Sequence, residues 1–90
     1  MPEFEWDEIK ERTNFEKHGI SFVAARKLFD GRPVITRELA YRSEQRYSTT
    51  GELELDFYTA VWTWRGDQIR LISVRRASRE ERREYRQIQL

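Results

Sequence analysis

The fold of this chain is most constrained by two long strand-like segments in its C-terminal half. Residues 55–64 (LDFYTAVWTW) and 68–76 (QIRLISVRR) are rich in β-branched and aromatic residues, which favour extended strands. Gly66 and Asp67 lie between them and are typical of a two-residue hairpin turn. The sequence therefore predicts an antiparallel hairpin, against which the rest of the chain must pack a second layer.

A two-residue turn fixes which residues of the hairpin lie opposite each other. One face is predicted to hold the pairs Trp64–Ile69, Trp62–Leu71, Ala60–Ser73 and Tyr58–Arg75. The other face is predicted to hold Thr63, Val61, Thr59 and Phe57, opposite Arg70, Ile72, Val74 and Arg76. Because the first face is the more apolar, we expect helices to bury it and the second face to stay half exposed to solvent.

Two short helices are predicted in the N-terminal part of the chain. Residues 8–18 follow Asp7, whose side chain suits an N-cap, and precede Gly19, which can adopt the left-handed conformation that ends a helix. Ser21 can cap a second helix over residues 22–29, where apolar residues recur at helical spacing. A helical pair therefore precedes the sheet.

Three other segments have strand character. Residues 34–42 and 45–50 lie between the second helix and the hairpin and alternate moderately in polarity. Residues 4–6 can form a short edge strand before the first helix. With the hairpin, residues 34–42 and 45–50 predict an antiparallel sheet of about four strands.

The chain ends in a highly charged helical segment. Ser78 and Glu81 have the spacing of a capping box, which predicts a helix that starts at about residue 79. Four arginines then share one face of this helix: Arg79, Arg82, Arg83 and Arg86. Two helices, a sheet and a C-terminal helix make one α+β domain over residues 1–90.

Positive charge is concentrated towards the C-terminal end. The net charge is +1 overall, but residues 1–18 have six acids against three bases, and residues 65–90 have eight arginines against four acids. Fourteen of the seventeen cationic residues are arginine, whose planar guanidinium matches phosphate and carboxylate. A nearly neutral protein with one basic region can hold a nucleic acid locally.

The residue types argue against several kinds of site. The chain has no cysteine, so no disulfide is expected, and a reducing compartment such as the cytoplasm fits. A single histidine without cysteine argues against structural zinc, and we expect neither a metal nor a cofactor. No apolar run approaches the roughly 20 residues that span a membrane, and the first residues do not have the pattern of a signal peptide.

Cleavage of RNA is compatible with the residues that remain, because the ribose 2′-hydroxyl of the substrate is itself the nucleophile. Lys17 and His18 fall in the last turn of the first helix, where they can move protons or simply complement the helix dipole. Arg46 can bind phosphate or lie exposed on its strand. Arg75 and Arg76 must point to opposite faces of theirs, so one of them needs an acid, a carbonyl or a ligand phosphate.

Several motifs of the chain are shared with a known family. Residues 4–22 contain F-x-W-D, a predicted helix, K-H-G and an S-F entry to the second helix. Residues 66–85 contain GDQIRLISVRRA followed by a charged helix. Together with shorter matches at residues 29–31 (FDG) and 45–47 (QRY), these motifs resemble those of BrnT-type toxins. Residues 62–64 (WTW) depart from the family, which often has His or Tyr followed by Thr-Glu there.

The resemblance implies a RelE-like fold and an endoribonuclease toxin of a bacterial type II toxin–antitoxin pair. The implied partners are RNA and a small ribbon-helix-helix antitoxin, in a toxin–antitoxin hetero-oligomer that contacts operator DNA only through the antitoxin. The implied catalytic residues are Lys17, His18, Arg46 and Arg75. The residues expected to bind RNA are Arg70, Ser73, Arg76, Arg79, Arg82 and Arg83.

Two other functions fit the same residues. The arginines of the last strand and helix can serve a nucleic-acid-binding module without catalysis, in which phosphates and stacked bases are held but not cut. They can also meet an acidic protein partner. The helical arginines can equally form a solvated face interleaved with glutamates. Incubation of metal-free protein with single-stranded RNA separates cleavage from binding.

Overall fold

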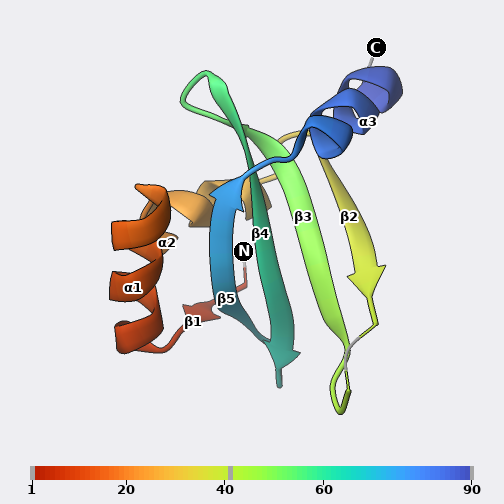
Figure 1. Cartoon of the computed structure of the whole chain (residues 1–90). Coiled ribbons are helices and arrows are strands. Elements are labelled where there is room, and N and C mark those ends of the chain that lie inside the picture. Colours follow the sequence, from red (N-terminus) through yellow and green to blue (C-terminus); the bar gives the residue numbers. More distant parts are fainter. Residues whose placement is uncertain (1, 41, 90) are drawn as a thin grey trace.

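A five-stranded sheet with helices on both sides forms the domain. Figure 1 shows the computed structural model, which describes residues 2–40 and 42–89. The strand order is β1-β5-β4-β3-β2, and α1 and α2 lie on the opposite side of β5 from β4 and β3 in the view of Figure 1. The elements are β1 (Phe4–Glu5), α1 (Glu8–His18), α2 (Phe22–Ala25), the 3₁₀ helix η1 (Arg26–Phe29), β2 (Val34–Leu39), β3 (Arg46–Leu53), β4 (Asp56–Arg65), β5 (Gln68–Arg76) and α3 (Arg79–Gln89).

The predicted α+β class is confirmed, but the sheet is mixed and has a fifth strand. Phe4 lies opposite Ile69 and Glu5 opposite Arg70, so β1 pairs with the first part of β5 in parallel. The other neighbouring strands are antiparallel. The short edge strand was predicted, whereas its parallel pairing was not, because two residues contain no signal for the strand they will join.

The helix boundaries follow the predicted caps. The Asp7 carboxylate accepts hydrogen bonds from the backbone N–H groups of Ile9 and Lys10, at 2.9 and 3.0 Å. Gly19 has φ +72° and ends α1. Ser21 caps α2, as predicted, but the helix expected over residues 22–29 changes to 3₁₀ geometry after its first turn. Such tightening is common at the ends of helices.

Two strand boundaries were predicted wrongly. The strand expected over residues 34–42 ends at Leu39; Tyr41 lies outside the described residues. The strand expected to end at residue 50 continues through Gly51 to Leu53. Glycine serves here for close packing rather than for a turn, because a Cβ at this position would lie 2.8 Å from Val34 Cγ1.

The last hairpin keeps the predicted register near its turn and loses it further away. Trp64 lies opposite Ile69 and Trp62 opposite Leu71, as predicted, but a β-bulge between Val61 and Trp62 then shifts the pairing. Beyond the bulge the pairs are Val61–Ser73, Ala60–Val74, Thr59–Arg75 and Tyr58–Arg76. The predicted pairs Ala60–Ser73 and Tyr58–Arg75 are therefore wrong.

Because of the bulge, the last residues of β5 face the opposite way from the predicted register. Val74, predicted to be half wet, is fully buried in the core, while Arg75 turns to the opposite face. Trp62 is buried as predicted and donates a 2.8 Å hydrogen bond from Nε1 to the Thr49 hydroxyl. Trp64 is 46% exposed, so its predicted burial is wrong.

No helix of the described residues is long and apolar enough to cross a membrane.

Candidate functional site

The face of the sheet turned away from α1 and α2, here called the open face, is polar. Its side chains form rows across four strands, because residues of one strand alternate between the two faces. One row is Ile35, Thr50, Thr59 and Arg75, and the next is Arg37, Ser48, Val61 and Ser73. Arg46 follows on the same face by the two-residue periodicity of β3. Arg70 reaches this face because it lies opposite Thr63, which alternates with Val61 and Thr59 along β4, and because the bulge shifts β5 by one residue between Arg70 and Ser73.

At one end of the open face, here called the helix end, α3 places Glu81 against Arg75. The two side chains form a bidentate ion pair, with Arg75 Nη1 2.8 Å from Glu81 Oε1 and Nη2 3.0 Å from Oε2. Glu81 Oε1 also accepts hydrogen bonds from the Ser78 backbone N–H and the Thr59 hydroxyl, at 2.8 and 3.0 Å. The Ser78 hydroxyl in turn accepts the Glu81 N–H at 3.1 Å, which confirms the predicted capping box.

These contacts stabilise the charged forms of both partners. The hydrogen bond from Arg75 is the main cause that lowers the pKa of Glu81 from 4.5 to about 2, against the opposing effect of burial. The hydrogen bond to Glu81 raises the pKa of Arg75 in the same way. The pair is therefore ionised throughout the pH range in which a cell works.

The opposite end of the open face, here called the turn end, lies near the Gly66–Asp67 hairpin turn and contains a chain of ion pairs. Arg46 Nε lies 3.1 Å from Glu44 Oε1, and Arg65 Nη1 lies 3.5 Å from Glu44 Oε2. Arg65 Nε and Arg70 Nη1 share Glu5 Oε1, at 3.9 and 3.5 Å. Three arginines thus share two carboxylates, that of Glu5 in β1 and that of Glu44 just before β3.

Lys17 and His18 lie in the last turn of α1, near the same end of the sheet as Arg75 but not on the open face. Helix α1 runs alongside β5 in the same direction (Figure 1). Glu5, which precedes α1, lies opposite Arg70 near the start of β5, and Asn14, later in α1, bonds to Val74 near the end of β5. The end of α1 therefore lies near the end of β5. Lys17 is exposed and His18 is half buried.

Asn14 was missed by the sequence analysis, and it closes the edge of β5 that β1 leaves open. Its buried amide donates to the Val74 carbonyl at 2.8 Å and accepts from the Val74 N–H at 3.1 Å. The side chain thus replaces a neighbouring strand for one residue. A polar residue in a helix that consists mostly of polar residues gave no signal of this contact.

The four residues expected to be catalytic do not lie at one point of the sheet. Lys17 and His18 at the end of α1, and Arg75 on the open face, lie towards one end of the sheet, whereas Arg46 lies at the turn end. Two strand spacings and four residues separate the Cα atoms of Arg46 and Arg75, roughly 16 Å. Ser73 lies on the open face between the two ends. Arg46 and Arg75 therefore do not lie side by side on the open face.

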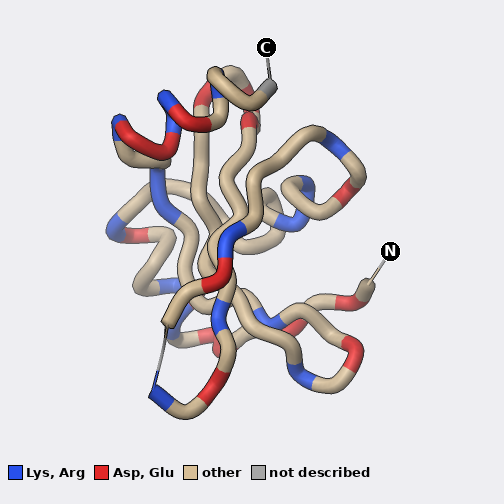
Figure 2. The backbone as a smooth tube through the Cα atoms, turned by 90° about the vertical axis from the view of Figure 1, so that its right-hand side faces the viewer, with Lys and Arg blue, Asp and Glu red and all other residues tan. Residues whose placement is uncertain are grey.

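The remaining arginines expected to bind RNA lie elsewhere. Arg76 comes directly after Arg75 in β5 and therefore lies on the opposite, helix-covered face. There it pairs with Asp56, and its guanidinium lies 5.9 Å from the Tyr58 ring centre. Arg79, Arg82, Arg83 and Arg86 line one shallow depression with Gln87, which confirms their shared helical face. Figure 2 shows acidic and basic residues interspersed along the chain, α3 included.

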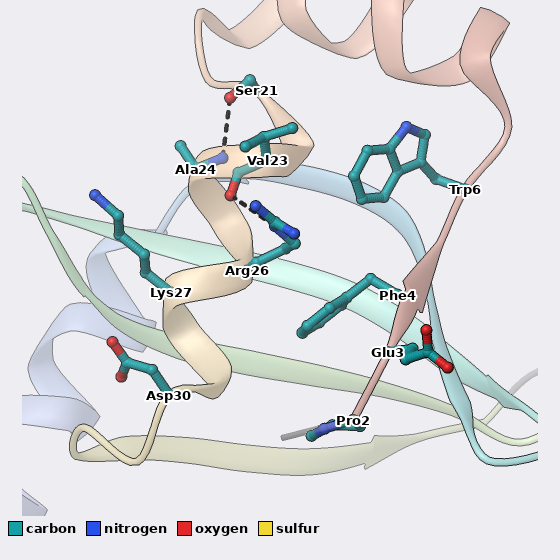
Figure 3. Close-up of a pocket in the computed structure, with 10 residues that line it drawn as sticks. All are labelled: Pro2, Glu3, Phe4, Trp6, Ser21, Val23, Ala24, Arg26, Lys27 and Asp30. Carbon is teal, nitrogen blue, oxygen red and sulfur yellow. Dashed lines mark hydrogen bonds between the residues drawn. The ribbon is translucent and has the colours of Figure 1, made fainter.

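A groove between β1 and the α2–η1 segment lies on the helix-covered side of the sheet (Figure 3). Its volume is about 720 Å³, within the range of small-molecule pockets. Phe4, Trp6 and Val23 form its apolar part, and Arg26 and Lys27 stand beside it. None of the residues expected to be catalytic or to bind RNA lines it. Among the residues that the structure describes, no group of three or more His, Asp or Glu side chains is placed to hold a metal ion.

The fold and the open face define a small α+β domain with an arginine- and hydroxyl-bearing sheet surface. Residues 6–81 match the family described as the ribonuclease toxin, BrnT, of type II toxin–antitoxin systems. The chain therefore belongs to the BrnT family, as its motifs indicated. No curated protein matches the chain.

Proposed function

We propose that this chain is a metal-independent endoribonuclease that cleaves RNA through attack of the ribose 2′-hydroxyl on the neighbouring phosphate. The observation that carries the proposal is the open face of a chain of the BrnT family, where Arg46, Arg70, Ser73 and Arg75 share one polar surface. Arg75 also contacts α3, the helix that carries Arg79, Arg82, Arg83 and Arg86, through Glu81. Single-stranded RNA laid across this face would meet arginines at both ends.

In this proposal the helix end holds the reacting phosphate. The Arg75 guanidinium binds the phosphate oxygens and stabilises the negative charge that grows on them as the 2′-oxygen attacks. His18 or Lys17, near the same end of the sheet, assists the transfer of protons to and from the two oxygens. Arg46 and Arg70 hold phosphates further along the strand, and α3 offers Arg79, Arg82 and Arg83 to its flank.

The test is incubation of purified protein with single-stranded RNA in EDTA, followed by analysis of the product ends. Attack by the 2′-hydroxyl predicts cleavage that persists without free metal and leaves 2′,3′-cyclic phosphate or 3′-phosphate ends. Products with 3′-hydroxyl ends would contradict the mechanism. Binding of RNA without any cleavage would instead favour a nucleic-acid-binding module.

We propose a small ribbon-helix-helix antitoxin as the protein partner, acting in the cytoplasm. The support is membership of a toxin–antitoxin family and the excess of four positive charges in residues 65–90. An acidic segment of the antitoxin would cover the open face and exclude RNA. Co-expression with the neighbouring gene should yield a hetero-oligomer whose affinity falls with salt. A toxin that elutes alone beside an expressed neighbour would contradict this partner.

A further inference from the structure

The Arg75 guanidinium has three edges, and only part of it is used within the protein. Nη1 donates one N–H to Glu81 Oε1 and another to the Arg76 carbonyl, at 2.8 and 3.2 Å. Nη2 donates one N–H to Glu81 Oε2 at 3.0 Å. Among the described residues, Nε and the second N–H of Nη2 have no hydrogen-bond partner.

Those two uncommitted N–H groups form a fork of their own. A guanidinium is planar, so the Nε–H and the outer Nη2–H point in the same direction, which is the geometry that receives two phosphate oxygens. The Arg75 side chain is 38% exposed, so part of it can contact a ligand. Glu81 occupies the edge formed by Nη1 and Nη2, here called the end edge. The edge formed by Nε and Nη2, here called the side edge, remains for a phosphate.

Glu81 is itself fixed from three directions. Its Oε1 receives N–H or O–H groups from Arg75, the Ser78 backbone and Thr59, which belong to the end of β5, the start of α3 and β4. A phosphate that displaced Glu81 from Arg75 would have to compete with all of these contacts. A phosphate that uses the side edge disturbs none of them.

We propose that Glu81 is the positioning residue of Arg75: it clamps one edge of the guanidinium so that the other presents a two-pronged site for an RNA phosphate. The proposal rests on the proposed function and adds the residue that orients its principal arginine. Rotation of a free arginine side chain would present this fork only part of the time, whereas the clamped side chain presents it in one geometry.

The alternative is that Glu81 competes with RNA for Arg75, and the two possibilities predict opposite results. Glu81→Gln keeps the capping box, because glutamine serves at this position, but the amide cannot accept from both Nη groups. The change also adds one positive charge. If charge or competition dominates, RNA binding tightens; if positioning dominates, it weakens.

Glu84→Gln is the matched control. Glu84 lies in the next part of α3, pairs with Arg37, and gives the same change of charge on neutralisation. Binding is measured with a 2′-O-methyl oligonucleotide, which keeps the phosphates and lacks the nucleophile, and cleavage is measured with the matching RNA. We expect Glu81→Gln to reduce the cleavage rate about tenfold or more and weaken binding, with Glu84→Gln equal to or tighter than the unchanged protein.

Two further measurements separate positioning from a general loss of structure. The Glu81→Gln change should not weaken binding further in an Arg75→Ala background, because the residue that it orients is gone and only the change of charge remains. NMR of the arginine side chains should show slow rotation of the Arg75 guanidinium in the unchanged protein and in Glu84→Gln, but fast rotation in Glu81→Gln. A structural defect alone would not produce this pattern.

The outcomes distinguish the two proposals. If the unchanged protein neither binds nor cleaves RNA, the proposed function fails, and the phosphate site fails with it. If the unchanged protein cleaves RNA and Glu81→Gln cleaves or binds as well or better, the proposed function stands and the positioning role of Glu81 is overturned. Fast rotation of Arg75 in the unchanged protein would overturn it independently of RNA.

Discussion

The two ends of the open face hold their arginines in different ways. At the helix end, Arg75 has a carboxylate to itself, with two hydrogen bonds of 2.8 and 3.0 Å. At the turn end, Arg46, Arg65 and Arg70 share Glu44 and Glu5 through contacts of 3.1 to 3.9 Å. One end has a single fixed guanidinium, whereas the other has several that can exchange partners.

In the proposed reaction, this difference suits the two ends to different tasks. A reacting phosphate needs a donor in one orientation, because only a fixed donor stabilises the transition state without reorganisation. Phosphates further along a strand need charge more than geometry, since RNA is flexible and its backbone contacts mainly position it. A shared network with exposed members can follow such a backbone, and Arg65 is 50% exposed.

The edge of β5 shows the same contrast. Its first part is closed by the backbone of β1, through Phe4 and Glu5. Its last part is closed at Val74 by the side chain of Asn14. The helix end of the open face therefore depends on one amide for the position of the strand that presents Arg75.

The largest effect on stability is expected from Asn14→Ala. This change leaves the buried N–H and carbonyl of Val74 without partners, which should lower the free energy of unfolding by about 3 kcal/mol. Denaturant unfolding measures the change, with Thr13→Ala as the control from the exposed side of the same helix. A loss below about 1 kcal/mol would show that water replaces the amide and that both edges of β5 are equally secure.

The next largest effect is the difference between Arg75→Ala and Arg46→Ala in the rate of RNA cleavage. Arg75→Ala removes the clamped donor and should reduce kcat about 100-fold, as for an oxyanion-stabilising group. Arg46→Ala removes one member of a shared network, and we expect about a tenfold loss, chiefly in KM. Cleavage assays on folded variants give both values. Equal losses would show that the two ends act together on one phosphate.

Much of the fold could be predicted because its signals are local. Asp7, Gly19, Ser21 and the Ser78 capping box each act within four residues, so their spacing in the sequence is enough to identify them. The Gly66–Asp67 turn likewise fixes the nearest pairs of the hairpin. The bulge was not predictable in this way, because an extra residue in one strand leaves the alternation of apolar residues on each side almost intact.

The same bulge limited the prediction of the site. The sequence showed that Arg75 and Arg76 face opposite ways, but a continuous register assigned Arg75 to the covered face. Glu81 was identified only as a capping residue, since its contact with Arg75 depends on where α3 returns to the sheet. Contacts between distant segments, such as Asn14 with Val74, have no local signal at all.

Acid should weaken the helix end specifically. The pKa of Glu81 is about 2 in the folded protein against an ordinary 4.5, so its contribution to stability is complete above pH 4.5 and is lost as the pH falls towards 2. Because the side chain is 25% exposed, we expect a loss of about 1–2 kcal/mol rather than the full value of the shift.

Unfolding of the unchanged protein and of Glu81→Gln, at several pH values between 6 and 2, measures this contribution. The difference in stability between the two proteins should shrink over that range, while other carboxylates affect both alike. A difference that stays constant down to pH 2 would show that the clamp contributes no linkage between protonation and folding.

The smallest effect is expected from Arg65→Ala at the turn end. Its contacts are single, at 3.5 and 3.9 Å, and half of the side chain is in solvent, so the loss of stability should be about 0.5 kcal/mol or less. Arg46 and Arg70 keep their own contacts with Glu44 and Glu5 when Arg65 is removed. High salt should abolish even this small effect, because the screening length falls to about 3 Å at 1 M.

Arg75→Ala is the comparison: it leaves a partly buried carboxylate without its partner and should cost about 2 kcal/mol of stability at low salt and at high salt alike. Chemical denaturation with urea, which is uncharged, gives both values. A loss above about 1.5 kcal/mol for Arg65→Ala would mean that the turn end is a cooperative network, as rigid as the clamp at the helix end.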